Sequence, residues 1–196
     1  MDKINFKKDL GYLYNASSRT PSIVQVPEMY YLKIEGEGSP EGQGFQHAAG
    51  TLYPIAYTLK YMIRENLNID FGVMPMEVQW NVNRERKGEF TWTMMLMQPH
   101  YIAKKLFEEA CDRVAVKYNV PYLSKVRYEN LAEGLCVQMM HKGDYNLMNH
   151  TLEIMIDYIK EQGYTSSRDT HDIYLNNVLK TKTENLKTIM RLPIFK

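Results

Sequence analysis

The stretches MEVQWNV (residues 76–82) and HDIYLNN (residues 171–177) lie in different halves of the chain and share one pattern. In each, apolar and polar side chains alternate, which is the period-two pattern of a β-strand with one buried face. When the two stretches are superimposed, Asp172 aligns with Glu77. The same superposition aligns Ile173 with Val78 and Tyr174 with Gln79. We therefore expect equivalent strands in two related halves.

The segments around these stretches follow one order in both halves. Alternation or helical periodicity predicts a strand, a helix and two strands in each half. In the first half these are residues 30–38, 51–66, 76–82 and 88–98, with a turn at 83–88. In the second half they are residues 135–143, 147–163, 171–177 and 185–195. A long amphipathic helix, residues 99–118, is expected to link the halves.

The predicted fold class is therefore α+β, with tandem duplicated strand-helix-strand-strand units. The helices must cover one face of the antiparallel sheet to bury their apolar stripes, which leaves a concave ligand cleft on the other face. Residues 1–27 are predicted to form an N-terminal arm. Residues 28–196 then form a single domain, with repeat one at about 28–98 and repeat two at about 133–196.

Composition excludes several classes of function. The formal net charge is +1, and the short basic clusters at Lys7–Lys8 and at Arg84, Arg86 and Lys87 are typical of solvated surface, so no nucleic-acid partner is expected. No apolar run is long enough for a membrane span or a signal peptide. The two cysteines show no CxxC spacing, which favours a reduced, cytoplasmic protein. The histidines are isolated, so neither a metal nor a cofactor is predicted.

Two carboxylates are the candidate centre of the cleft. A period-two interpretation directs Val78, Trp80, Ile173 and Leu175 toward the helices. It directs Glu77, Gln79, Asp172 and Tyr174 into the concave side. Equivalent carboxylates would then meet near a pseudo-twofold axis. His171 faces away from Asp172 in this interpretation, which favours a structural role for it.

Longer segments resemble the GyrI-like family, which includes a gyrase inhibitor and effector domains of multidrug-sensing regulators. The similarity is carried by YLKIEGEGSPEGQGFQHAAGTLYPIAYTLKYMIR, VMPMEVQW, WTMMLMQP, LFEEA, EGLCVQMMHKGDY, HDIYLNN and ENLKTIMRLPI. The resemblance implies a cleft for flat, hydrophobic and often cationic small molecules. It also implies, for a stand-alone protein, hydrolysis of the cyclopropane in DNA-alkylating natural products. Family members typically carry Glu at the position of Asp172.

The chemistry expected from that resemblance needs a base, a placed water and an oxyanion donor. Asp172 or Glu77 is the candidate base and Tyr174 the candidate donor, although both carboxylates could instead pair with a ligand cation or with Lys and Arg neighbours. The candidate ligand-binding residues are Trp80, Trp92, Tyr31, Tyr57, Tyr145, Gln79, Met95 and Met140. The alternatives to a hydrolase are a non-catalytic drug-sequestering module and a topoisomerase-inhibiting interaction protein.

Overall fold

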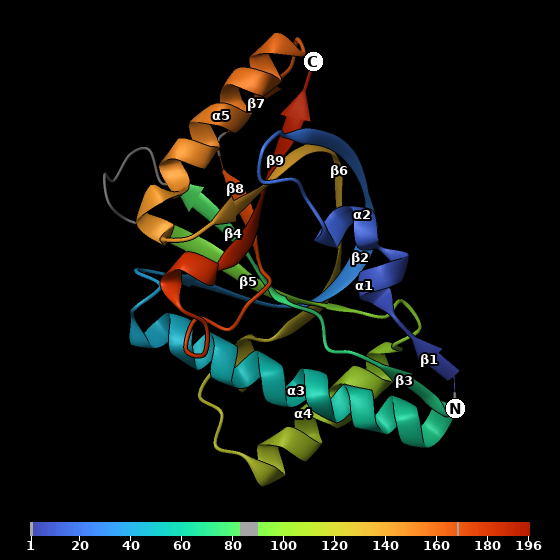
Figure 1. The fold of residues 1–196 in the computed structure, drawn as a ribbon. Coiled ribbons are helices and arrows are strands. Elements are labelled where there is room, and N and C mark those ends of the chain that lie inside the picture. The colour runs from blue at the N-terminus through green and yellow to red at the C-terminus, as the bar shows by residue number, and fades with distance from the viewer. Residues whose placement is uncertain (1, 83–89, 168) are drawn as a thin grey trace.

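The computed structural model describes residues 2–82, 90–167 and 169–196 (Figure 1). The elements of the first half are β1 (Asp2–Ile4), α1 (Phe6–Asp9), α2 (Gly11–Tyr14), β2 (Ser22–Glu37), α3 (Gln43–Leu67), β3 (Ile69–Phe71), β4 (Met76–Val82) and β5 (Phe90–Gln98). Those of the second half are α4 (Lys104–Lys117), η1 (Leu123–Lys125), β6 (Arg127–Lys142), η2 (Tyr145–Leu147), α5 (Met148–Glu161), β7 (Thr165–Ser166), β8 (Thr170–Tyr174), η3 (Thr183–Asn185) and β9 (Lys187–Phe195). The predicted turn at 83–88, with Arg84, Arg86 and Lys87, lies outside the described residues.

The antiparallel sheet closes into a barrel of six strands. The strands follow the order β6-β2-β5-β4-β8-β9, and β9 pairs again with β6. Figure 1 shows this ring, with α3 and α4 below it and α5 along its upper left. The α+β class and the antiparallel pairing are confirmed. The face opposite the helices was predicted to be a concave ligand cleft, whereas the pairing of β9 with β6 closes the sheet and makes that face the interior of the barrel.

Closure depends on the length of β2 and β6, which are 16 residues each. Their predicted counterparts, 30–38 and 135–143, cover only the second part of each strand. The first parts pair with each other from Ser22 to Lys33, with an interruption at Pro27. Proline cannot donate to the ladder, and Gly134, which pairs next to it at Val26, has a positive φ of 78°. These two residues allow the paired strands to bend around the barrel.

The two halves repeat the predicted element order. β2, α3, β4 and β5 correspond to β6, α5, β8 and β9. The strand order is also symmetric, since β2-β5-β4 meets β8-β9-β6 in the middle of the sheet. A duplication as the origin of this symmetry stays a prediction.

Helix α3 begins earlier than the predicted residue 51. Its buried stripe includes Ala48, so burial continues past Gly50 toward Gln43 and outweighs the weak helix propensity of glycine. Pro54 lies inside the helix, where it removes one backbone hydrogen bond. The linking helix α4 is shorter than the predicted 99–118, because a turn with Ile102 N donating to Pro99 O precedes it. Among the described residues, no helix has the length and apolarity needed to cross a membrane.

Gly36 allows Trp92 to pack flat on β2. The two residues are paired across β2 and β5, and a methyl group on Gly36 would overlap the indole ring of Trp92. Trp92 is 1% exposed and has little room to move.

We expect Gly36→Ala to destabilise the protein by about 1–3 kcal/mol through overpacking. Gly50→Ala is the matched control, because a methyl group there meets open space inside a helix. That variant should be stabilised by up to about 1 kcal/mol. Urea denaturation of both variants measures the difference, and equal stability of Gly36→Ala and the parent would contradict the packing argument.

The N-terminal arm closes one end of the barrel. Figure 1 shows α1 and α2 at the right-hand mouth of the ring. Leu13 and Tyr14 of α2 are 0% and 7% exposed and belong to a buried cluster with Tyr31, Met95 and Ile173 of the barrel strands. Met140 N also donates to Ser17 O. The interior is therefore a packed core to which the arm contributes.

Candidate functional site

Strand β8 presents its side chains to two different environments. Asp172 is paired with Val78 of β4. Glu77 is paired with Ile173. Directly paired residues of antiparallel strands project from the same face, so Asp172 lies on the outer face with Val78, beneath the helices. Glu77 projects into the barrel. The prediction that Glu77 and Asp172 converge in one cleft is wrong.

Asp172 lies at the seam between two cores. On one side Val78 belongs to the core packed under α3. On the other side Met190, its partner in β9, belongs to the core packed under α5. Figure 1 shows β4 and β8 running between these two helices. The two halves of the fold therefore meet at this carboxyl group.

The Asp172 carboxyl is buried and incompletely hydrogen-bonded. The residue is 4% exposed. The side chains of Trp80 and Thr170 lie close enough to favour its charged form, whereas Oδ1 has no hydrogen-bond partner among the described residues. Burial raises the pKa of Asp172 to about 7, although His171, Thr170 and Trp80 act to lower it. A carboxyl with a pKa near neutrality can accept or release a proton at physiological pH.

Four half-buried aromatic rings surround this carboxyl group. Trp80 Nε1 donates to the hydroxyl of Tyr174 over 3.2 Å. Phe45 of α3 stacks on Trp80, with ring centroids 5.6 Å apart and an interplanar angle of 10°. Tyr145 of η2 meets the Tyr174 ring edge-on at 5.9 Å. The rings come from α3, β4, η2 and β8, so both halves of the fold build this cluster, the Asp172 site.

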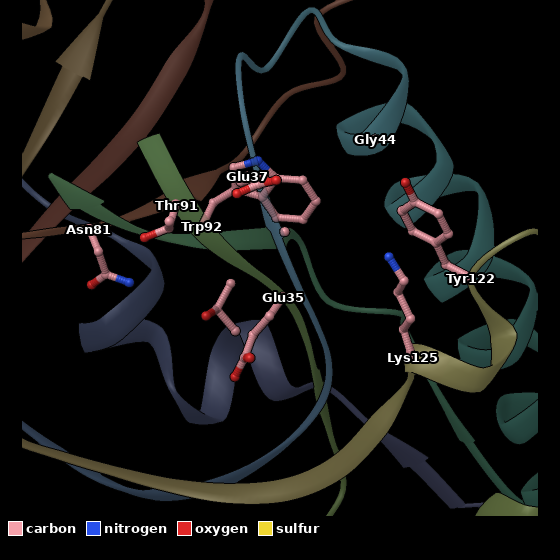
Figure 2. Close-up of a pocket in the computed structure, with 10 residues that line it drawn as sticks. Glu35, Glu37, Gly44, Asn81, Thr91, Trp92, Tyr122 and Lys125 are labelled. Atoms are coloured by element: carbon pink, nitrogen blue, oxygen red, sulfur yellow. The ribbon is translucent and has the colours of Figure 1, made fainter. Parts of the chain in front are cut away.

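A surface hollow of about 550 Å³ lies next to the Asp172 site (Figure 2). It is lined by Glu35, Gly36, Glu37, Gly44, Asn81, Thr91, Trp92, Thr93, Tyr122 and Lys125. Figure 2 shows Tyr122 and Lys125 on one side of it, across from Asn81 and Thr91. Phe45 contacts Trp92 edge-on at 5.2 Å and stacks on Trp80. Phe45 thus lies between Trp92, which lines the hollow, and the indole of Trp80.

The barrel interior holds a second cluster, made of buried charges. His171 Nε2 lies 2.9 Å from Glu77 Oε2, and Nδ1 lies 3.0 Å from Glu133 Oε2. Arg191 Nη1 lies 3.4 Å from the same Glu133 oxygen. The hydroxyl of Tyr31 is 3.4 Å from Glu77 Oε2. Two carboxylates and two cationic side chains therefore form one network, the interior charge network.

Mutual contacts decide the protonation of this network. Burial lowers the pKa of His171, but Glu133 and Glu77 outweigh it and raise the value to about 9. Burial raises the pKa of Glu133, but His171 and Arg191 outweigh it and the net shift is downward. At neutral pH the network thus consists of two negative and two positive groups.

The N-terminal arm binds this network directly. The hydroxyl of Tyr14 donates to Glu77 Oε1 over 2.7 Å. Burial, and then the charge of Glu77, raise the pKa of Tyr14 well above its usual value. Two more hydrogen bonds hold the arm, from Arg191 Nη2 to Leu13 O (3.0 Å) and from Gln138 Nε2 to Tyr12 O (2.7 Å).

The structure thus divides the predicted site residues. Asp172, Tyr174, Trp80 and Tyr145 come together on the outer face, and Trp92 is linked to them through Phe45. Glu77, Tyr31, Met95 and Met140 lie inside the barrel. Gln79 projects from the same face of β4 as Glu77. Tyr57 is exposed on α3, away from both clusters.

Sequence reasoning missed Phe45, Glu133, Arg191 and Tyr14. The sequence leaves it open whether the helix begins as early as Phe45, because Gly50 and Pro54 would then lie inside it, and Tyr14 lies in a segment without clear periodicity. Arg191 stands between Met190 and Leu192, and a charged residue in so apolar a strand is the signal that could have revealed it.

The interior charge network is not arranged as a metal site. Glu77 and Glu133 bind opposite nitrogens of the His171 ring, so the three side chains do not point to a common centre. Across residues 2–82, 90–167 and 169–196, no group of three His, Cys, Asp or Glu side chains could hold a metal ion.

Known proteins similar to this chain share both its sequence and its fold. The model of the GyrI-like small molecule binding domain matches residues 95–194. A hydrolase from Listeria innocua is 34% identical, with a TM-score of 0.88 over 98% of this chain and 100% of that one. A hydrolase encoded by lin2189 from Listeria innocua is 33% identical, with a TM-score of 0.89 over 99% and 100% of the two chains.

A more distant structure shares the fold alone. The C-terminal domain of EcmrR is 11% identical, with a TM-score of 0.55 over 90% of this chain and 98% of that one. No curated protein matches the sequence.

Proposed function

This chain belongs to the GyrI-like family of small-molecule-binding domains, and we propose that it acts as a hydrolase of cyclopropane-bearing or similarly electrophilic aromatic xenobiotics. The observation that carries the proposal is the state of Asp172. Its carboxyl is buried, has one oxygen without a hydrogen-bond partner among the described residues, and has a pKa of about 7. Such a group is suited to act as a general base at neutral pH.

The aromatic rings of the Asp172 site favour a flat ligand. Phe45 stacks on Trp80 where a planar ring of the ligand would stack, and half-buried aromatic faces also attract cationic groups. We propose that the ligand enters from the hollow beside Trp92 and displaces Phe45 with the first turn of α3. Its ring would then lie against Trp80, with the reacting carbon near Asp172.

The proposed reaction opens the cyclopropane by addition of water. Asp172 accepts a proton from water as the water oxygen bonds to the less hindered ring carbon. The strained C–C bond breaks, and its electron pair moves through the conjugated dienone to the carbonyl oxygen, which becomes a phenol on protonation. Tyr174 is the proposed donor, because its hydroxyl already accepts from Trp80 and can direct its own proton to the ligand.

Spacing supports these roles. Asp172 and Tyr174 are two residues apart on one face of β8, which separates them by about 6–7 Å along the strand. Both side chains can therefore reach a ligand bound on that face of the strand. Two Listeria innocua proteins similar to this chain are described as hydrolases, which agrees with a hydrolytic use of the site.

Turnover of a cyclopropane-containing DNA alkylator, followed by its chromophore, tests the proposal. We expect more than one equivalent to be consumed, and kcat/KM should rise with pH through about 7 because Asp172 must be ionised. Asp172→Asn should lower kcat at least about 100-fold. Asp157→Asn, on the exposed surface of α5, is the control and should leave kcat unchanged.

An unchanged rate in Asp172→Asn would show that the base is elsewhere. Tight stoichiometric binding without turnover would instead favour the drug-sequestering alternative, in which the same aromatic rings bind the ligand and Asp172 pairs with its cation.

A further inference from the structure

His171 and Asp172 are adjacent in β8 and project from opposite faces of it. The imidazole lies in the barrel with Glu77 and Glu133. The carboxyl lies outside with Trp80 and Thr170. One strand thickness therefore separates the interior charge network from the Asp172 site.

The surroundings of His171 favour a charged ring. Nδ1 hydrogen-bonds to Glu133, whereas Nε2 lies 2.9 Å from Glu77 Oε2 without a hydrogen-bond partner among the described residues. A carboxylate accepts hydrogen bonds only, so Nδ1 carries a hydrogen, and a neutral ring would direct the lone pair of Nε2 at the nearby Glu77 carboxylate. The ring, which is 1% exposed, is therefore an imidazolium between two carboxylates.

The charge balance of the barrel interior also favours a protonated His171. Glu77 and Glu133 bring two negative charges, and Arg191 brings one positive charge. Tyr14 and Tyr31, which face the same space, stay neutral because burial and Glu77 raise their pKa values. Without a charged His171, the barrel would bury an uncompensated negative charge, which is strongly unfavourable.

On the outer face, the groups around Asp172 are neutral. They are Trp80 and Val78 of β4, Met190 and Thr188 of β9, Tyr145 of η2, and Thr170 and Tyr174 of β8. Tyr145 and Tyr174 are the titratable members, and burial raises both their pKa values. The charged form of Asp172 is thus favoured by His171 on the opposite face of the strand, and by Thr170 and Trp80 on its own face.

We propose that His171 is a positioning residue for the reaction, an imidazolium at neutral pH that stabilises ionised Asp172 from the opposite face of strand β8. The proposal rests on the proposed function for the catalytic role of Asp172. The electrostatic coupling between His171 and Asp172 does not depend on that function. The interior charge network is thereby given a role, since Glu77 and Glu133 hold the cation that the outer site needs.

The N-terminal arm also contributes to the position of His171. Tyr14 donates to the Glu77 oxygen that does not contact His171. Docking of α2 therefore fixes Glu77, and Glu77 fixes the imidazolium. Side-chain contacts therefore run from Tyr14 through Glu77 to His171, and the last step to Asp172 is electrostatic, across the strand.

Carboxyl ¹³C NMR titration of the ligand-free protein tests the coupling without any substrate, with Asp172→Asn assigning the signal. Opposite charges on the two faces of one buried strand interact strongly enough to move a titration midpoint by about one pH unit or more. We expect a midpoint near 7 in the parent and an upward move of that size in His171→Gln. His150→Gln, on the exposed surface, is the control and should leave it unchanged.

Imidazole ¹⁵N shifts of the parent supply a second measurement that does not depend on folding of the variants. A doubly protonated His171 at pH 7 supports the proposal, and a neutral tautomer would overturn it. An unchanged Asp172 midpoint in folded His171→Gln would also overturn it. If the midpoint moves but no substrate is turned over, the coupling stands and the proposed function fails.

Discussion

Replacing Asp172 by Asn is expected to stabilise the folded protein by about 2–4 kcal/mol at pH 8 while it abolishes turnover. The pKa of Asp172 is raised from 3.8 to about 7 in the folded state, chiefly by burial. Folding therefore favours the protonated carboxyl. Each pKa unit corresponds to about 1.4 kcal/mol between the two protonation states, so ionisation of this group in the native state opposes folding.

The sign of the effect defines the pH window. Below pH 3.8 both states are protonated and Asp172 imposes no penalty. The penalty grows between 3.8 and 7 and is constant above 7. The advantage of Asp172→Asn should accordingly be large at pH 8 and below about 1 kcal/mol at pH 4. Urea denaturation at both pH values measures it.

His171 adds a loss of stability at higher pH. Its folded pKa of about 9 lies above the usual 6.5, so its contribution is complete below 6.5 and is lost as pH rises through 9. The parent should therefore lose stability from pH 4 to pH 9, and Asp172→Asn should remove the part below 7. Asp157→Asn should follow the parent throughout, because that carboxyl is exposed. If Asp172→Asn is less stable than the parent at pH 8, the ionised carboxylate must be stabilised by an interaction that the structure does not contain.

A stability cost at one residue supports a functional interpretation of that residue. A buried carboxyl that opposes folding at neutral pH would be removed by an isosteric amide unless the ionised form were needed. Turnover and stability are thus expected to change in opposite directions at position 172, whereas damage to packing would lower both.

The types and order of the elements could be predicted because their signals are local. Period-two and helical patterns identified β4, β5, β8, β9, α3 and α5 without knowledge of their neighbours. Barrel closure could not be predicted in this way. It depends on pairing between the first parts of β2 and β6, where Pro27 and Gly134 interrupt any alternation.

The faces of β8 were assigned incorrectly for a related reason, whereas those of β4 were predicted correctly. Superimposing the two stretches implied that Glu77 and Asp172 are equivalent, whereas the register pairs Asp172 with Val78. A shift of one residue moves a side chain to the other face of the sheet. Both faces of these strands are covered, one by helices and one by the barrel interior, so hydrophobicity does not distinguish them.

Removal of the Arg191 charge should have the second large effect. Arg191→Met keeps the length of the side chain but leaves Glu133 with only His171 as a charged partner, and it leaves Leu13 O without its hydrogen bond. Breaking a fully buried ion pair from one side typically costs about 3–5 kcal/mol. We expect a loss of that size in urea denaturation, together with faster proteolysis of residues 5–20 as the arm loses its anchor.

Arg113→Met is the matched control. Arg113 Nη2 lies 2.8 Å from Glu109 Oε1, closer than Arg191 lies to Glu133, but both side chains are about half exposed. Solvent screens this pair, so its removal should change stability by less than about 1 kcal/mol. Equal effects of the two variants would show that the interior charge network contributes no more than a surface pair.

Glu133→Gln in the Arg191→Met background separates charge from packing. The double variant leaves Glu77 and His171 as a neutral pair in the barrel, so no net charge remains buried. Its loss of stability should be smaller than the sum of the two single losses by about 1–3 kcal/mol, the range of coupling expected for directly contacting residues. If the two losses simply add, Arg191 stabilises the protein through packing and through its hydrogen bond to the arm. A charge effect would instead let the neutralisation of Glu133 offset part of the loss of the guanidinium.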